Sequence, residues 1–432
     1  MAFFRDRDKP NPQGYELTDV VVYREERLHE LELFLPATTA TKTLVKDMKY
    51  RAMQAQTLKE AAALEVPTVA PSAKKTRLDH RKEDDCLAER EEMCARAQED
   101  EIALIGTHRK VYEWDAPLAL IEDKRSADTD LHTRDQKIFE TLKKLGHMRR
   151  IARPESEHVF AALEMLRQRQ PHYSAVVALV CQHLRLLFAQ GKPPHLPAIL
   201  LLGEPGVGKT HFTQQLASAL QTPMRRHSFD NATTGPTLTG SDKHWGNTSY
   251  GLMFEILGLN EVINPVVLLD EIDKASDTPH RNPAAPLHTL LEPISARQAT
   301  DLSLGLRFDA SFVTWIATAN DPACIPASLR SRFTEFFILP PLGKQALQVA
   351  QYIAESVFQE LNLPGIQPVP SSISKLLAHL TAREQIQLLK RAYASAFDDD
   401  RTCIDINDIP RSAINDDDHG SNQEEEKPRL MH

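Results

Sequence analysis

The sequence predicts an α/β fold in which a parallel sheet is flanked by helices and followed by a small helical domain, with a mainly helical extension before the sheet. Two observations carry this prediction. The apolar run at residues 198–202 leads directly into a glycine-rich loop and then into a helical pattern. A second apolar run, at residues 266–269, ends in two carboxylates. Strands buried on both faces are continuously apolar, and ligands bind at the carboxyl ends of such strands.

The glycine-rich loop predicts binding of a nucleoside triphosphate. Its eight residues are Gly203, Glu204, Pro205, Gly206, Val207, Gly208, Lys209 and Thr210. Such glycines let backbone N–H groups surround phosphates, with the positive end of the following helix behind them. We expect Lys209 to reach the β and γ phosphates and the Thr210 hydroxyl to hold Mg²⁺.

The second apolar run predicts that the nucleotide is hydrolysed. Asp270 and Glu271 follow Val266-Val267-Leu268-Leu269 at the edge of the sheet where ligands bind. Asp270 is expected to hold the Mg²⁺ shell, and Glu271 to polarise the water that attacks the γ phosphate. The alternative interpretation is an acidic turn at the end of a strand.

Composition restricts the class of protein. The chain has 432 residues and a net charge of -9, which disfavours a general affinity for nucleic acid. Its five cysteines are scattered without a Cys-x-x-Cys pair, which fits a reducing compartment. The N-terminus lacks an apolar targeting segment, and no stretch approaches the length of a membrane span, so we expect a cytoplasmic protein without membrane partners.

Further strands are expected at residues 312–319 and 336–339, and a helix of about five turns ends near Leu361. Ser371 and Ser372 offer an N-cap for a helix through Leu380, and another helix follows it.

The region after the third strand resembles AAA+ ATPases. The motif Thr318-Ala319-Asn320, followed by residues 325–333, is similar to their sensor-1 and arginine-finger region. The resemblance implies that Asn320 orients the attacking water and that Arg332 reaches the γ phosphate held by the next subunit, with Arg330 competing for that role. The alternatives are a turn cap for Asn320 and a surface position for Arg332.

Within AAA+ proteins, residues 170–412 resemble the ATPase module of Lon proteases in the order and spacing of their motifs. The resemblance implies that His172 and Tyr173 lie on the adenine side and that Arg383 is the sensor-2 arginine. It also implies that Trp245 is a pore-loop aromatic, the alternative being a packed core residue. Pro286 departs from the family pattern and predicts that its helix begins later or bends.

The expected domains are an N-terminal module or docking arm at 1–70, a charged helical linker at 71–154, the large nucleotide-binding domain at 155–342, the helical lid at 343–412 and an acidic disordered tail at 413–432. The resemblance implies a ring, with six subunits expected, that uses ATP and Mg²⁺ to remodel or unfold an unidentified protein client. We expect no proteolysis in cis, and a protease or effector acting in trans is possible.

Two alternative functions remain open from the sequence. One is a nucleotide-controlled switch or scaffold that recruits an effector through its N-terminal region. The other is an AAA+ motor on nucleic acid, because Ser331-Arg332 is similar to the interface motif of clamp loaders, although the acidic net charge disfavours it.

Overall fold

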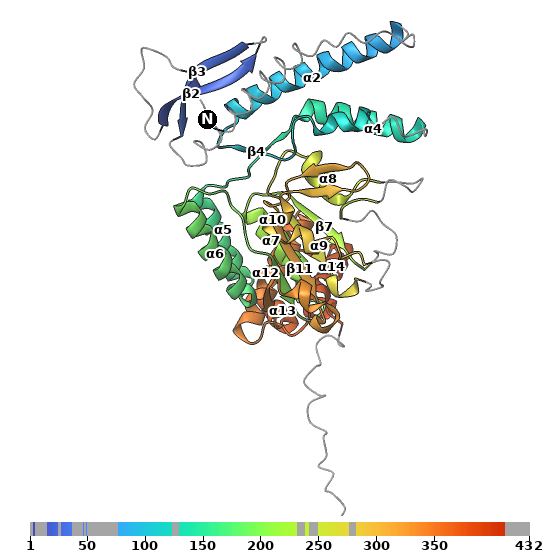
Figure 1. The fold of residues 1–432 in the computed structure, drawn as a ribbon. Helices are drawn as coiled ribbons and strands as arrows, with labels where there is room; N and C mark the ends of the chain where they lie inside the picture. The colour runs from blue at the N-terminus through green and yellow to red at the C-terminus, as the bar shows by residue number, and fades with distance from the viewer. Residues whose placement is uncertain are drawn as a thin grey trace, which may run out of the picture. The chain divides into compact units, whose positions relative to one another are not determined.

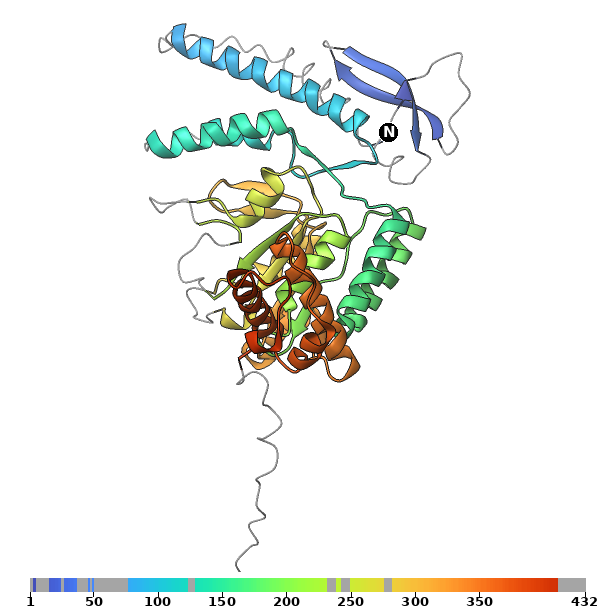
Figure 2. The same ribbon diagram turned by 180° about the vertical axis from the view of Figure 1, so that it is seen from behind.

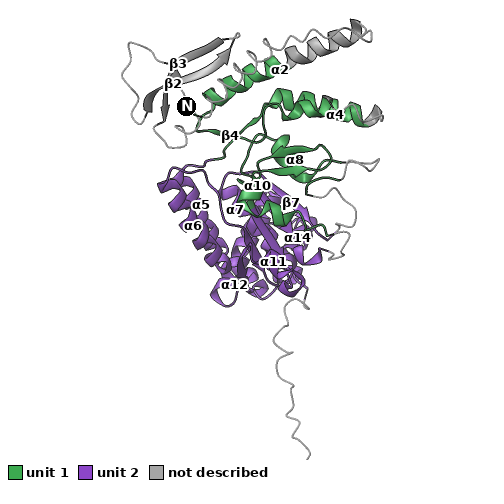
Figure 3. Cartoon of the chain, in the orientation of Figure 1, with its two compact units in different colours: residues 1–152, 231–265, 276–314 green, residues 153–230, 266–275, 315–432 purple. Residues whose placement is uncertain are grey.

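The computed structural model describes residues 3–4, 15–24, 27–36, 46, 49, 77–122, 129–230, 238–241, 249–275 and 282–410. The chain divides into two compact units (Figure 3). Unit 1 comprises residues 1–152, 231–265 and 276–314, and unit 2 comprises residues 153–230, 266–275 and 315–432. The predicted domain boundaries stay a prediction. The predicted acidic tail at 413–432 lies outside the described residues.

The sheet of unit 2 has five strands in the order β12-β6-β11-β8-β7. Two of these strands, β7 and β11, are labelled in Figure 1. The strands are β6 (Ile199–Leu202), β7 (Met224–Ser228), β8 (Val266–Asp270), β11 (Thr314–Ala319) and β12 (Thr334–Phe337). β6 pairs in parallel with both β11 and β12, and β7 pairs in parallel with β8. The predicted parallel sheet is therefore confirmed, although β11 and β12 each begin two residues away from the expected start.

Three helical segments of unit 2 precede β6 in the sequence, and a fourth follows it directly along the chain. They are α5 (Ser156–Arg169), η2 (Pro171–Tyr173) and α6 (Ser174–Ala189) before the strand, and α7 (Lys209–Ala219) after it. They share one apolar core with the strands, to which Leu163, Val177, Ile199 and Leu216 contribute. The segment Pro171–Ala189 has the length and mean hydropathy, 1.2, of a membrane span. This finding differs from the expectation that no stretch approaches the length of a membrane span. In the structure 28% of the segment is buried, and Val177 is among its residues that pack in the core of unit 2.

The C-terminal part of unit 2 is helical, as predicted, and both ribbon views show its helices together (Figures 1 and 2). It contains α12 (Lys344–Leu361), α13 (Ser371–Leu377), α14 (Ala382–Asp398) and η5 (Ile406–Asp408). Val357, Leu377 and Tyr393 pack in its own apolar core. The expected N-cap at Ser371 was one residue late, because Pro370 holds the cap position and Ser371 is already helical.

Unit 1 begins with an antiparallel sheet of β1 (Phe3–Phe4), β2 (Tyr15–Arg24) and β3 (Arg27–Pro36), in the order β1-β3-β2. The charged segment forms the long helix α2 (Arg77–Ala103). The remaining elements before residue 152 are β4 (His108–Lys110), η1 (Ala116–Leu118), α3 (Ala119–Glu122), α4 (Thr129–Leu145) and β5 (Met148–Arg150).

The later part of unit 1 contains α8 (Leu252–Gly258), α9 (Leu287–Leu290), α10 (Pro293–Ala296) and the hairpin of β9 (Ala299–Asp301) with β10 (Leu306–Phe308). Helix α9 begins directly after Pro286, which occupies its N-cap position. The prediction that this helix starts late is confirmed, because proline cannot donate the hydrogen bond that a helix interior requires.

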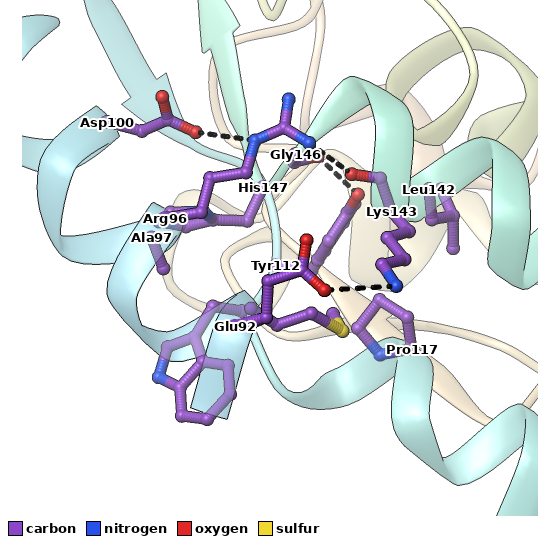
Figure 4. Close-up of a pocket in the computed structure, with 12 residues that line it drawn as sticks. Glu92, Arg96, Ala97, Asp100, Tyr112, Pro117, Leu142, Lys143, Gly146 and His147 are labelled. Carbon is purple, nitrogen blue, oxygen red and sulfur yellow. Dashed lines mark hydrogen bonds and ion pairs between the residues drawn. The ribbon is translucent and has the colours of Figure 1, made fainter. Parts of the chain in front are cut away.

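A hollow in unit 1 lies beside α2, α4 and the β4–β5 ribbon (Figure 4). Arg96 of α2 donates to the carbonyl oxygens of Lys143 and Lys144, each at 2.9 Å, and so caps the C-terminal end of α4. Lys143 also pairs with Glu92 at 3.6 Å. The polar groups around this hollow are therefore largely engaged in joining two helices, and none belongs to the glycine-rich loop.

Candidate nucleotide site

The glycine-rich loop connects β6 to α7 at the carboxyl end of the sheet. Gly206 and Gly208 have φ angles of 88° and 93°, which glycine adopts readily. Gly203 is held against the end of β12, and a Cβ placed on it would lie 2.4 Å from the carbonyl oxygen of Ile338. The fold therefore requires glycine at 203 for space and at 206 and 208 for backbone conformation.

Lys209 is the first residue of α7, and its ammonium group turns back into the loop. Its Nζ donates to the carbonyl oxygens of Gly203 at 2.6 Å and Glu204 at 3.0 Å, and to Oδ1 of Asn320 at 2.9 Å. Burial lowers the pKa of Lys209, while the nearby carboxylates, of which Asp273 has the largest effect, raise it. The ammonium thus lies in the cradle of backbone groups, where a phosphate is expected.

Asp270, at the end of β8, is the centre of a polar network. Its carboxylate accepts hydrogen bonds from the hydroxyls of Thr210, at 3.2 and 3.3 Å, and of Thr318. Both Nε and one terminal nitrogen of Arg226 lie 2.7 Å from Oδ2 of Asp270. The network joins the start of α7 to β7, β8 and β11.

Glu271 adopts a left-handed conformation, with φ 56°, that is uncommon for a residue with a side chain. Its backbone N–H donates to the Thr318 hydroxyl at 3.0 Å. Two residues later, Oδ2 of Asp273 accepts from the backbone N–H groups of Asn320 at 3.1 Å and Asp321 at 3.2 Å. These bonds fix the turn after β8 against the end of β11, where Asn320 lies.

The residues present fit a magnesium nucleotide. Two glycines with positive φ open the backbone cradle, Lys209 supplies a cation, and Thr210 and Asp270 bring a hydroxyl and a carboxylate together. Oxygen ligands of this kind suit Mg²⁺, which retains several waters. Oδ1 of Asp273 is buried without a hydrogen-bond partner, and such a group is accounted for by a ligand or water that the site takes up.

His172 and Tyr173 lie beside the loop, where both contact Val207. The Tyr173 hydroxyl donates to the carbonyl oxygen of Val207 at 3.3 Å, and a His172 ring nitrogen lies 3.3 Å from the same oxygen. Tyr173 stacks on Phe212 with the ring centroids 4.0 Å apart. Burial lowers the pKa of His172, so its ring is neutral near pH 7. Their contact with adenine stays a prediction.

The structure distinguishes the two candidate finger arginines, which lie at the end of α11 (Ala327–Arg330) and just after it. Arg330 is held in a two-point ion pair by Glu335 of β12, with both N–O distances 2.8 Å. Arg332 donates from one terminal nitrogen to the carbonyl oxygen of Ser328 at 2.6 Å, and its Nε has no hydrogen-bond partner. This difference favours Arg332 over Arg330 for a role toward another subunit, which stays a prediction.

The N-terminal end of α14 lies against the glycine-rich loop. A Cβ placed on Gly206 would lie 3.3 Å from Cβ of Thr381, which caps α14 through a reciprocal bond with Glu384. Arg383 is exposed in the first turn of this helix. Its predicted contact with nucleotide phosphates stays a prediction, and Trp245, the predicted pore-loop residue, lies outside the described residues.

Sequence reasoning missed three contributors to the site. Arg226 lies on the polar edge strand β7, whose sequence Met-Arg-Arg-His-Ser gives no apolar signal for a strand. Thr318 and Asp273 stand inside motifs that were recognised, yet their contacts depend on strand order. The order of strands β7, β8 and β11 cannot be read from one sequence. If that order had been known, it would have placed all three residues at the site.

The comparisons with known proteins agree with this geometry. Residues 199–341 match the family described as "ATPase family associated with various cellular activities (AAA)". The fold and the loop therefore define a nucleotide-binding ATPase module of the AAA+ class.

Within that class the likeness is to Lon. The chain is 31% identical to Lon protease 2 of Thermus thermophilus over 198 residues, which cover 45% of this chain and 25% of that protein. It is 30% identical to the Lon protease of Campylobacter concisus over 249 residues, which cover 55% of this chain and 30% of that protein. The chain thus carries an AAA+ ATPase module that resembles the one in Lon proteases, and it spans less than a third of their length.

A solved structure of a Thermotoga maritima RuvB mutant is similar over 54% of this chain and 67% of that chain. The TM-score is 0.38 and the sequence identity 18%, a likeness too distant to bear on function.

Proposed function

We propose that this protein is a Lon-like AAA+ ATPase that assembles into a ring, with six subunits expected, and couples ATP hydrolysis to the remodelling or unfolding of protein clients in the cytoplasm. The observation that carries the proposal is a set of two hydrogen-bonded pairs at the edge of the sheet. Lys209 donates to Asn320 at 2.9 Å, and Thr210 donates to Asp270 at 3.2 and 3.3 Å. These are the groups that phosphoryl transfer requires at the γ phosphate and the metal.

When bound, Mg²⁺ would supply positive charge against the negative charge that develops during phosphoryl transfer. Thr210 and Asp270 would hold the metal with its waters, and Lys209 would hold the phosphates. Glu271 and Asn320, on neighbouring turns, would orient the attacking water. Arg332 would reach the nucleotide of the next subunit, so hydrolysis would depend on assembly.

The proposal is tested by trapping a client. Glu271→Gln removes the group that activates water but retains the phosphate contacts, so it should bind ATP, remain assembled and retain a client that the wild-type protein releases. Lys209→Ala is the control, because it lacks the phosphate contact and should capture nothing in ATP. Capture that is equal in both variants would contradict an ATP-driven cycle.

A second experiment separates a remodelling motor from a nucleotide-controlled switch. Trp245→Ala should retain assembly and basal ATP hydrolysis but lose the stimulation of hydrolysis by the captured client, because a large apolar ring is suited to gripping an unfolded chain. A switch would hydrolyse ATP without such stimulation. Sedimentation with ATP would measure the number of subunits in the same preparations.

A further inference from the structure

Arg226 of β7 is the direct counter-ion of Asp270. Nε and one terminal nitrogen of Arg226 both lie 2.7 Å from Oδ2 of Asp270. The two side chains differ in environment, since that of Asp270 is 5% exposed and that of Arg226 is 56% exposed. A buried carboxylate is costly without a partner, and here the partner approaches from the solvent side.

The Asp270 carboxylate is fully engaged in this arrangement. Thr318 and Thr210 donate to Oδ1, and Arg226 and Thr210 share Oδ2. A hydrated Mg²⁺ held by Asp270 must use the same lone pairs. The guanidinium and the metal are therefore alternative partners for one oxygen, and the guanidinium is the one attached to a solvent-exposed side chain.

Three carboxylates, Asp270, Glu271 and Asp273, surround Lys209 closely enough to act on its pKa. A nucleotide without metal brings further negative charge to this place, where Lys209 provides one positive charge. A second cation at Asp270 lowers that repulsion, because opposite charges in contact act strongly where water is excluded.

We propose that Arg226 substitutes for Mg²⁺ at Asp270, so that it supports nucleotide binding before the metal arrives and yields its place on Oδ2 when the metal binds. This inference rests on the proposed nucleotide-binding function. Arg226 acts through Asp270 and is a positioning residue. Its loss should make nucleotide affinity depend more strongly on the metal, which measurements of ATP hydrolysis alone would not reveal.

The test is calorimetric titration of the full chain with ADP, once with excess Mg²⁺ and once with EDTA. Arg226→Gln should weaken ADP binding in EDTA by roughly fivefold or more, the upper range for a solvent-accessible ion pair. With Mg²⁺ its affinity should equal or exceed that of the wild type. Arg226→Lys retains the charge, so its affinity for ADP in EDTA should lie between those of the wild type and Arg226→Gln.

Arg225→Gln is the matched control, since it removes the same charge from the neighbouring position of β7, whose side chain points to the opposite face. It should change the affinity little in either buffer. An equal loss of affinity for Arg226→Gln in both buffers, or a change no larger than that of Arg225→Gln, would overturn the inference. Wild-type protein that binds no ADP in either buffer would overturn the proposed function itself.

Discussion

The ammonium of Lys209 donates a hydrogen bond to Oδ1 of Asn320, with a distance of 2.9 Å between Nζ and the oxygen. The bond connects the start of α7 to the end of β11 across 111 residues of sequence. It arises because β6 and β11 are adjacent parallel strands, so the residues that follow them meet at one edge of the sheet. The phosphate-binding cation and the predicted water-orienting amide are therefore parts of one hydrogen-bonded unit.

Lys209→Ala and Glu271→Gln should separate nucleotide binding from turnover. Lys209→Ala removes the cation from the cradle and should weaken ATP binding by roughly a hundredfold, as expected for a charged hydrogen bond in a buried site. Glu271→Gln should bind ATP with near wild-type affinity and lose hydrolysis, because Glu271 acts on the water. Titration with ATP and a phosphate-release assay measure the two properties. A comparable loss of binding in both variants would contradict the assigned roles.

Local sequence was sufficient to predict the strands that end in the candidate site residues. Each of β6, β8 and β11 is continuously buried, and this pattern is visible as an apolar run that ends in Gly203, Asp270 or Asn320. Side-chain partners were not predictable, because they depend on which strands are neighbours. The pair of Arg226 with Asp270 is an example, since β7 had to be placed beside β8 before these two residues could be brought together.

Arg332→Ala and Arg330→Ala should affect different properties, the first ATP hydrolysis and the second the stability of the fold. Arg332→Ala should retain ATP affinity and reduce hydrolysis, by roughly a thousandfold if it acts as an arginine finger. Arg330→Ala breaks the solvent-accessible pair with Glu335 and should lower the free energy of unfolding only slightly, without the large loss of hydrolysis expected for Arg332→Ala. Steady-state hydrolysis and chemical denaturation measure the two effects.

Mixed assemblies test whether Arg332 acts between subunits. An equimolar mixture of Arg332→Ala with Lys209→Ala should recover part of the activity, because some interfaces then combine an intact loop with an intact arginine. The absence of recovery at every mixing ratio, with mixed assembly verified by sedimentation, would count against action in trans.

Glycine substitutions should separate steric overlap from backbone strain. A Cβ at Gly203 would lie 2.4 Å from the Ile338 carbonyl oxygen, so Gly203→Ala must shift the loop or the end of β12. It should lower the free energy of unfolding by about 1–3 kcal/mol and weaken nucleotide binding. Gly208→Ala meets no atom within 4 Å and has only the strain of its φ of 93°, about 1–2 kcal/mol.

Gly191→Ala is the control for strain, since Gly191 has a φ of 63° and open space around it but lies away from the loop. It should lower stability without changing nucleotide affinity. If Gly203→Ala behaved like Gly191→Ala in both denaturation and nucleotide titration, the close packing of the loop on β12 would be wrong.

Acidification should destabilise the protein through partly desolvated histidines of unit 2, and His211 provides the most direct test. The residue as a whole is exposed, yet desolvation of its ring lowers the pKa of His211 below its usual value of 6.5, so the folded chain binds this proton less readily than the unfolded chain. The stability that neutral His211 contributes is present above about pH 6.5 and is lost as the pH falls through the lower, folded pKa. Its Nδ1 lies 3.3 Å from Nε2 of the buried Gln170, an arrangement that protonation of Nδ1 would disrupt.

His211→Gln should therefore reduce the fall in melting temperature between about pH 7.5 and pH 5.5, because glutamine retains a polar partner for Gln170 and does not titrate in this range. Part of the fall should remain, since burial also lowers the pKa of His172 and His227. His158→Gln is the control, as the side chain of His158 is 71% exposed. Thermal melts across this pH range measure the slope. If the two variants gave the same slope as the wild type, protonation of His211 would not be the source of acid instability.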